Sequence, residues 1–204
     1  MIFLSTFGQL GQGYSTVLAI FKLLPKEKKI SKVFSAFSDV YVAVFRGTPM
    51  VVQLLVAYYV LLPIFGIKAD GLTVCEIMFG LNSGAYVCEI MRSGILSVDK
   101  GQMEAGRSLG LNYMQTMFRI VFPQAIKNIL PTLGNELITL IKETSVVSFV
   151  GATDLFTAFQ YIGSNNYEYM IPYLMMAVIY IVIIVLLTLL LKIIERRLRA
   201  SDQR

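Results

Sequence analysis

Long apolar stretches alternate with short polar segments along this chain. The cleanest stretch is YMIPYLMMAVIYIVIIVLLTLLLKII, residues 169–194. Further apolar regions cover residues 2–24, 48–66, 72–96 and 128–151. An α-helix rises about 1.5 Å per residue, so roughly 20 residues cross the ~30 Å hydrocarbon core of a bilayer. The pattern therefore predicts an all-α membrane protein with about five transmembrane helices.

The composition supports this class. Hydrophobic residues make up 56% of the 204 residues and charged residues only 15%, whereas about a quarter of the residues in a soluble domain are charged. The net charge of +5 comes from basic clusters beside apolar segments, at 22–32 and 192–204. Such clusters set membrane topology, so we expect no nucleic-acid partner. Because basic loops stay in the cytoplasm, the N-terminus is expected outside and the C-terminus inside.

Several kinds of chemistry are absent from the sequence. There is no histidine, which excludes histidine-based catalysis and histidine metal sites. Cys75 and Cys88 lie in one apolar segment without the spacing of a redox or metal pair. No G-x-x-x-x-G-K-[ST] phosphate loop is present. We therefore expect no enzyme activity in this chain, and no cofactor or metal bound by it.

One transmembrane domain is expected over residues 1–204. Its first span, 2–24, is atypical or shortened, because glycines and glutamines between positions 8 and 13 interrupt it. In the second span, Thr48 is expected to cap the helix and Pro49 to occupy its first position.

The fourth apolar region, 128–151, carries helix-breaking signals. Pro131 and Gly134 are expected to interrupt it. A polar cluster near its end, Lys142 to Ser145, predicts a further break.

A polar section between the third and fourth spans, residues 99–123, carries the signals of two short helices. Asp99 can cap a helix over 100–109, and Gln102 stands where it could close a capping box. Gly110 suits a left-handed residue past the helix end. A helix of under three turns is marginal alone, so contacts with something else must hold it.

Small residues leave one part of this first helix nearly bare. Ala105 and Gly106 would let another backbone approach closely. Glu104 and Arg107 place charges beside that site.

A second short helix is predicted after the glycine turn. Asn112 and Gln115 have the spacing of a capping box, and Pro123 is expected to end or kink the helix. The alternative for the whole section is an amphipathic helix that anchors the loop among lipid headgroups. Its apolar face is weak for that role, because Met103 and Leu109 are the only large apolar residues between 100 and 109.

The spacing in this section resembles the EAA loop of ABC importer permeases. The family pattern is E-A-A, three residues, G, nine residues, then I-x-L-P. Here Glu104-Ala105-Gly106 is followed at those intervals by Gly110 and by Ile120-Val121-Phe122-Pro123. Gly106 takes the place of the second alanine, and Phe122 takes the place of leucine.

Three further segments resemble polar amino-acid permeases. They are FRGTPMVVQ (45–53), SVDKGQMEAGRSLGL (97–111) and FPQAIKNILPTLGNELITLIKETSVVS (122–148). The resemblance implies the permease subunit of a polar amino-acid ABC importer in the bacterial cytoplasmic membrane. It also implies the type I (MetI-like) permease architecture.

The resemblance implies how such a chain is driven. The first helix of the polar section would be a coupling helix in a groove of an ATPase subunit. The implied coupling residues are Glu104, Ala105, Gly106, Arg107, Gly110, Ile120 and Pro123. A pair of ATPase subunits would bind ATP and magnesium. The other implied partners are a second permease chain, identical or sister, an extracytoplasmic amino-acid-binding protein and the lipid bilayer.

Ionisable groups inside the spans are candidates for the transport path. Charges in a bilayer cost free energy, so such groups are usually retained for a function. A break near the end of the fourth region could present helix-end dipoles to an amino acid. The candidate path residues are Glu136, Lys142, Glu143, Thr144 and Ser145. Bonding between helices is the structural alternative for these groups.

Several other polar positions have open interpretations. Glu89 is expected to pair with Arg92 one turn later. Arg46 and Gly47, expected on the cytoplasmic side of the second span, form either part of an inner gate or a topology anchor. Three tyrosines either line the path or pack between helices: Tyr58, Tyr59 and Tyr86.

Two other function classes remain as alternatives. A secondary transporter usually shows an internal repeat, and this sequence shows none. A membrane scaffold without transport would leave the intramembrane charges without a purpose.

Overall fold

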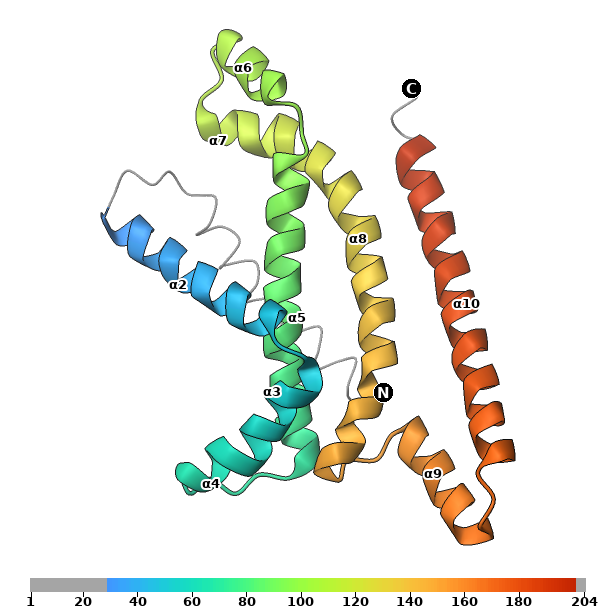
Figure 1. Ribbon diagram of the computed structural model, residues 1–204. Helices are drawn as coiled ribbons and strands as arrows, with labels where there is room; N and C mark the ends of the chain where they lie inside the picture. The colour runs from blue at the N-terminus through green and yellow to red at the C-terminus, as the bar shows by residue number, and fades with distance from the viewer. Residues whose placement is uncertain (1–28, 201–204) are drawn as a thin grey trace.

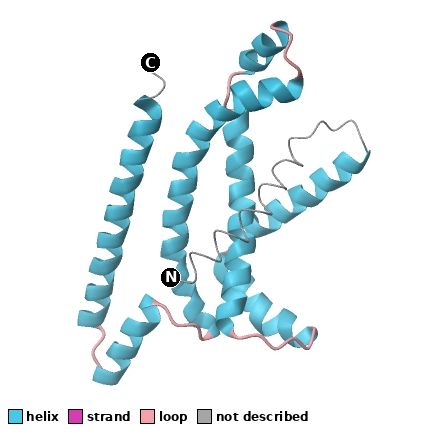
Figure 2. Ribbon diagram, turned by 180° about the vertical axis from the view of Figure 1, so that it is seen from behind, coloured by secondary structure: helices cyan, strands magenta, loops and turns pink. Residues whose placement is uncertain are grey.

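The computed structural model describes residues 29–200. Helices and short turns make up this part of the chain, with no strand in it (Figures 1 and 2). The predicted all-α fold class is therefore confirmed. The expected first span, 2–24, lies outside the described residues.

Three long helices form the frame of the molecule. They are α5 (Gly71–Leu96), α8 (Phe122–Glu143) and α10 (Met170–Ala200). α5 packs on α8, and α8 packs on α10, in the order in which Figure 1 shows them side by side. The third and fifth predicted spans, 72–96 and 169–194, are confirmed as helices.

A sharp bend lies at the start of the region predicted as the second span. The chain axis turns by 105° between Ser35–Gly47 and Met50–Ile64. The first part belongs to α2 (Lys29–Gly47), which the sequence did not predict. The second part consists of α3 (Met50–Val56), a π-helical turn η1 (Ala57–Leu61) and α4 (Leu62–Ile64).

The predicted second span, 48–66, is helical from Met50 to Ile64, but it qualifies as a membrane crossing only together with Ser35–Gly47. The predicted details of its start are wrong. Thr48 does not cap α3: its Oγ1 donates back to the carbonyl of Val44 in α2, at 2.7 Å. Pro49 is the N-cap of α3 and not its first helical residue. The physical reason is that proline disfavours a helical conformation at the residue before it, so α2 ends and α3 starts in a new direction.

The polar section forms α6 (Lys100–Ser108), α7 (Tyr113–Thr116) and a π-helical turn η2 (Met117–Val121) that leads into α8. Contrary to the prediction, α8 runs unbroken through Pro131 and Gly134. A Cβ added to Gly134 would lie 2.4 Å from Leu191. The missing side chain thus lets α10 pack closely, and this packing supports the helix despite the proline.

The predicted break near Lys142–Ser145 is also absent. α8 passes directly into a 3₁₀ helix, η3 (Thr144–Val150), and the chain turns only at Gly151, where φ is 75°. A helix that was not predicted follows, α9 (Leu155–Asn166). The Asp154 carboxylate caps it, accepting a hydrogen bond from the Thr157 N–H at 2.8 Å.

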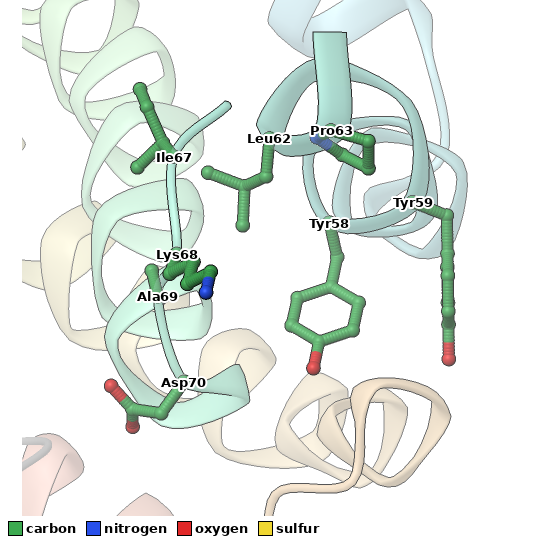
Figure 3. A pocket seen from close by; sticks show the side chains of 8 residues that line it. All are labelled: Tyr58, Tyr59, Leu62, Pro63, Ile67, Lys68, Ala69 and Asp70. Atoms are coloured by element: carbon green, nitrogen blue, oxygen red, sulfur yellow. The ribbon is translucent and has the colours of Figure 1, made fainter. Parts of the chain in front are cut away.

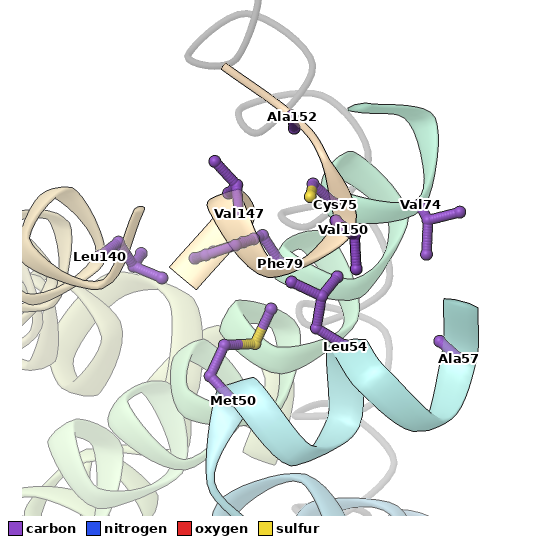
Figure 4. Packing of buried hydrophobic residues seen from close by; sticks show 10 residues of the cluster. All are labelled: Met50, Leu54, Ala57, Val74, Cys75, Phe79, Leu140, Val147, Val150 and Ala152. Carbon is purple, nitrogen blue, oxygen red and sulfur yellow. The ribbon is translucent and has the colours of Figure 1, made fainter. Parts of the chain in front are cut away.

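The largest buried cluster joins α3, α5 and η3. Met50 and Leu54 of α3 point toward Phe79 of α5 and toward η3 (Figure 4). Leu54 and Phe79 are fully enclosed. Cys75 lies in the same cluster as a free, buried thiol, in line with a packing role for it. The cluster ties the second half of the bent region to α5.

Length and apolar composition identify membrane-crossing candidates within residues 29–200. Met170–Leu198 qualifies as a single helix. Ser35–Gly47 with Met50–Ile64, and Tyr113–Val150 with Leu155–Asn166, qualify only as bent pairs. The count of five spans and their directions stay predictions.

Candidate functional site

The polar section 99–123 stands at one end of the molecule, beyond the tips of α5 and α8 (Figure 1). Asp99 begins α6 as predicted, because its carboxylate accepts a hydrogen bond from the Gly101 N–H at 2.7 Å. The predicted capping box with Gln102 does not form. The side-chain oxygen of Gln102 accepts instead from Gln124 in α8, at 3.2 Å.

Gly110 ends α6 in the left-handed conformation that was predicted, with φ of 82°. Its N–H donates to the carbonyl of Arg107 at 2.9 Å, and the Leu111 N–H donates to the carbonyl of Gly106 at 3.1 Å. These two bonds are the Schellman pattern, which satisfies the last carbonyls of a helix. Both ends of α6 are thus fixed by local bonds.

The second helix of the section begins with the predicted capping box. The Gln115 N–H donates to the Asn112 side chain at 2.9 Å, and the Asn112 N–H donates to the Gln115 side chain at 3.0 Å. Pro123 kinks this helix and does not end it. α7 lies across the end of the molecule and α8 turns away along its length (Figure 1).

A π-helical turn precedes the proline at this kink. A proline ring crowds the carbonyl four residues earlier and has no N–H to donate to it, and the wider turn η2, just before Pro123, gives the ring room. Pro63 follows η1 in the same way. Both π turns therefore have a local steric cause.

Gly106 packs within the section itself. It is buried, and a Cβ added there would lie 2.4 Å from Thr116 Cγ2, 2.8 Å from Thr116 Oγ1 and 3.2 Å from Ile120 Cδ1. The close approach predicted at Gly106 is therefore present, and the segments that approach it are α7 and η2 of the same section. The alanine of the family pattern would need α6 to sit slightly further from Thr116.

Further contacts join this end of α5 to α8. Asn128 Nδ2 donates to Ser97 Oγ at 2.9 Å. A Cβ added to Gly94 would lie 2.2 Å from Ile129 Cγ1, so the Ile129 side chain of α8 packs directly against the backbone of α5 there. These contacts hold α5 and α8 together next to the polar section.

Of the other predicted coupling residues, Ile120 is half-buried against Gly106, and the rest lie on the outside of the section. Glu104, Ala105, Arg107 and Pro123 are exposed. Sequence reasoning missed that large apolar side chains of the same section are also exposed, namely Leu109, Tyr113, Met114 and Phe118. Leu109 is 80% exposed and Phe118 is 60% exposed. The signal was present as large apolar residues recurring in an otherwise polar section.

The predicted path residues divide between two sides of α8 and η3. Lys142 and Ser145 line a cavity of about 230 Å³ against α9 and α10, together with Phe156, Met176, Tyr180 and Ile184. Thr144 Oγ1 donates to the carbonyl of Ile141 at 2.8 Å and so satisfies its own helix.

Glu136 and Glu143 lie on a different side of α8. They stand two turns apart on one face, are half-buried and interact electrostatically with each other. Glu136 also interacts with Arg46, from the end of α2. Glu136 is therefore within electrostatic range of Arg46, a residue that the sequence analysis assigned to the cytoplasmic side.

The motif FRGTPMVVQ forms the bend between α2 and α3, which we call the elbow (Phe45–Pro49). Gln53 Nε2 donates to the carbonyls of Phe45 and Thr48, at 2.8 and 3.0 Å, and to Thr48 Oγ1 at 2.8 Å. Asn82 Nδ2 of α5 donates to the Phe45 carbonyl at 3.2 Å and to Gln53 Oε1 at 3.0 Å. Gln53 and Asn82 are both buried, so this network fixes the elbow to α5.

The elbow places Arg46 beside the middle of α5, where Asn82 lies, and away from the end of a span where the sequence analysis expected it. Its guanidinium carbon lies 5.2 Å from the centre of the Tyr86 ring. Nearer the α6 end of α5, Arg92 pairs with Glu89 as predicted. Arg92 also interacts electrostatically with Asp39 of α2.

A second cavity, of about 510 Å³, opens at the end opposite α6, between η1–α4 and the segment that leads into α5 (Figure 3). Tyr58 and Leu62 face Ile67 and Lys68 across it. Asp70 caps α5 at its rim. A hydrogen bond from the Thr73 hydroxyl holds the pKa of Asp70 below its ordinary value.

Comparison with known families decides what this arrangement is. Residues 2–200 match the family described as binding-protein-dependent transport system inner membrane component. The chain belongs to this family. Members are permease components of the inner membrane, which agrees with the apolar composition and with the resemblance seen in the polar section.

Relatives within this permease family are similar over most of their length. The putative glutamine transport system permease protein of Rickettsia bellii is 39% identical over 188 residues, covering 92% of this chain and 86% of that protein. The arginine transport system permease protein of Bacillus subtilis is 41% identical over 169 residues, covering 83% and 77%. The L-cystine transport system permease protein of Bacillus subtilis is 41% identical over 186 residues, covering 91% and 79%.

Solved structures show the same fold. A crystal structure of an amino acid ABC transporter with histidines has a TM-score of 0.86 and 40% identity, covering 96% of this chain and 88% of that chain. An inward-facing structure of the MetNI methionine ABC transporter has a TM-score of 0.72 and 19% identity, covering 97% and 90%. This permease therefore has the type I ABC importer architecture.

Proposed function

We propose that this permease is the membrane subunit of an ATP-driven importer for a polar amino acid. Its relatives are named for glutamine, arginine and L-cystine transport, which supports this substrate class. ATP and magnesium bind to a separate pair of ATPase subunits in the cytoplasm. This chain binds no cofactor of its own, and its residues form the path through the bacterial cytoplasmic membrane.

The proposed topology has five crossings. They are residues 2–24, the bent α2–α4 region, α5, α8 with η3, and α10. α5 has 26 residues, or about 39 Å of helix, which exceeds a ~30 Å core. α10 ends beside the α6 end of the molecule (Figure 1) in the basic sequence ERRLRA. That end is therefore proposed to be cytoplasmic, with the N-terminus outside.

The observation that carries this function is the construction of the polar section. α6 is fixed at both ends, packed onto η2 through Gly106 and joined to α8 through Gln102. Charged and apolar side chains face outward from it. Apolar residues that neighbour charges on a rigid exposed surface suit a protein interface. The proposed occupant is the ATPase, whose closure would move α5 and α8 through these contacts.

The path is proposed to run along the face of α8 that carries Glu136 and Glu143. Lys142, Thr144 and Ser145 belong to the neighbouring side of α8 and η3 and are proposed to line its outer part. One such chain has few helices with which to enclose a path. We therefore propose a second permease, identical or sister, as its partner, and an extracytoplasmic amino-acid-binding protein that delivers the solute.

Reconstitution tests this function. The permease, its ATPase and its binding protein are placed in liposomes, and uptake of labelled glutamine, arginine and cystine is measured with and without internal ATP. Uptake of one of them that requires ATP and the ATPase is expected. Glu104→Lys should abolish most of this uptake while the protein still inserts, because the side chain is exposed. Gln160→Lys, on exposed α9 at the opposite end, is the matched control. Uptake driven by an ion gradient without ATP would contradict the proposal.

A further inference from the structure

The elbow fixes the backbone on both sides of one charged residue. Gln53 and Asn82 bond to the carbonyls of Phe45 and Thr48, and Arg46 stands between those two residues in the chain. These amides are buried, and a buried carbonyl that loses its donor is costly. The position of the Arg46 Cα is therefore set by a network that belongs to α3 and α5.

The Arg46 side chain extends over an aromatic ring of α5. Its guanidinium carbon lies 5.2 Å from the centre of the Tyr86 ring, the arrangement of a cation over an aromatic face. The side chain is exposed. Within residues 29–200 its guanidinium makes no salt bridge at 4 Å or less. Stacking occupies the plane of a guanidinium and leaves its edge N–H groups to bind a planar anion in two-point fashion.

The depth of this residue makes a topology anchor a poor explanation. Asn82 lies near the middle of α5 (Gly71–Leu96), and its bonds bring the elbow to that level. A charge near the centre of a membrane-spanning bundle is a functional candidate by default. Transporters also tend to bind solute near this depth, at helices that are interrupted there, and the 105° bend is such an interruption.

A group of opposite charge lies within electrostatic range of Arg46. This is Glu136 on α8. An α-amino acid carries a carboxylate and an ammonium group a few bonds apart. A guanidinium on the elbow and a carboxylate on α8 match these two charges.

We propose that Arg46 binds the carboxylate of the transported amino acid inside the membrane, and that Gln53 and Asn82 are positioning residues for it. This rests on the proposed import function and names a contact that the function needs. Glu136 faces the ammonium group. Tyr86 orients the guanidinium so that its N–H edge meets the solute.

The test uses the complete importer in liposomes, with labelled glutamine, arginine and cystine as the probes. Maximal uptake and the ATPase rate stimulated by the loaded binding protein are both measured. Arg46→Gln is expected to lower maximal uptake by about 10- to 100-fold, the loss typical of a charged hydrogen-bond partner. Arg46→Lys should lie between Arg46→Gln and the unaltered protein, because lysine keeps the charge without the two-point geometry. Arg197→Gln, on exposed α10, is the matched control.

The stimulated ATPase rate separates binding from folding. In Arg46→Gln this rate should stay within about twofold of the unaltered protein, because the polar section is untouched. A parallel fall of uptake and ATPase rate would overturn the proposal and assign Arg46 a structural role. Uptake at the unaltered rate would also overturn it. If the unaltered importer takes up none of the three probes, the proposed function fails, independently of Arg46.

A double-variant cycle tests the positioning role of the elbow amides. Gln53→Met removes all three donated bonds at similar volume and should lower uptake when Arg46 is present. In the Arg46→Gln background the same change should cause no further loss of uptake, while its effect on thermal stability persists. Additive losses of uptake would show that Gln53 does not act through Arg46. The same cycle with Asn82→Leu in place of Gln53→Met tests the amide that α5 contributes.

Discussion

Replacing Gly106 by valine is expected to push α6 away from the helix on which it packs. The first added atom would lie 2.4 Å from Thr116 Cγ2 and 2.8 Å from its Oγ1, whereas carbon atoms pack best at about 3.5–4.0 Å. Thr116 cannot easily turn aside. It is fully enclosed, it is β-branched and its hydroxyl donates to the Asn112 carbonyl at 3.0 Å.

The size of the effect follows from this overlap. Overpacking of this kind costs about 1–3 kcal/mol, and the strain falls on a helix of only nine residues. If α6 yields by moving off η2, its exposed residues no longer match the ATPase surface. A coupling loss of about 1–3 kcal/mol corresponds to roughly 5- to 150-fold weaker binding.

The assay titrates the ATPase subunit onto the permease in lipid nanodiscs and then compares ATP hydrolysed per amino acid imported in liposomes. Gly106→Val should weaken ATPase binding within that range and raise the ATP used per solute. Adding Thr116→Ala removes both clashing atoms and should restore most of the affinity. Equal affinity in Gly106→Val, or no recovery in the double variant, would refute the packing argument.

Further predictions concern two glycines of α5 and its N-cap. A Cβ at Gly71 would lie 2.1 Å from the Val150 carbonyl oxygen, so Gly71→Ala should destabilise the permease in detergent by about 1–3 kcal/mol. Within residues 29–200, nothing lies within 4 Å of a Cβ added to Gly80, so Gly80→Ala should stabilise the permease by up to about 1 kcal/mol; the reverse order in thermal melts would contradict both. Hydrogen bonds from Thr73 lower the pKa of Asp70 from its ordinary 3.8. The stability that this cap contributes is complete above pH 3.8 and is lost as the pH falls through the lowered pKa. In thermal melts followed by circular dichroism, Asp70→Asn should remove this part of the pH dependence.

The short-range features of the polar section were predictable from the sequence. Asp99, Gly110 and the pair Asn112–Gln115 form the expected caps, because each bond joins residues at most a few positions apart. The spacing of these residues alone specifies the geometry. The all-α class and the family followed from composition and from motifs of this kind.

Features set by contacts between distant segments were not predictable in this way. The elbow depends on a bond between Gln53 and Asn82, 29 positions apart. The unbroken course of α8 through Pro131 depends on close packing of Gly134 against Leu191. Local propensity predicted neither α2 nor the bend in the first case, and it predicted a break in the second; tertiary packing decides both.

The sequence also did not predict which of two neighbouring small residues is buried. Ala105 and Gly106 are neighbours of similar size, yet one is exposed and the other is buried. Only the position of Thr116, ten residues away, decides which of them meets the next helix. The exposed apolar residues of the section were missed for a related reason. The sequence does not show which side chains pack inside the section and which remain exposed to a partner.

Site-directed crosslinking of the polar section to the ATPase is the most direct measurement. Ala105→Cys places a thiol on the exposed side of α6, while the two native cysteines are buried. Tyr167→Cys, 94% exposed in the turn between α9 and α10 at the opposite end, serves as the control. In native membranes, a short thiol crosslinker should join residue 105 to the ATPase subunit and should not join residue 167 to it. Attachment of residue 105 only to lipid or to an external protein, or of residue 167 to the ATPase, would contradict the proposed coupling.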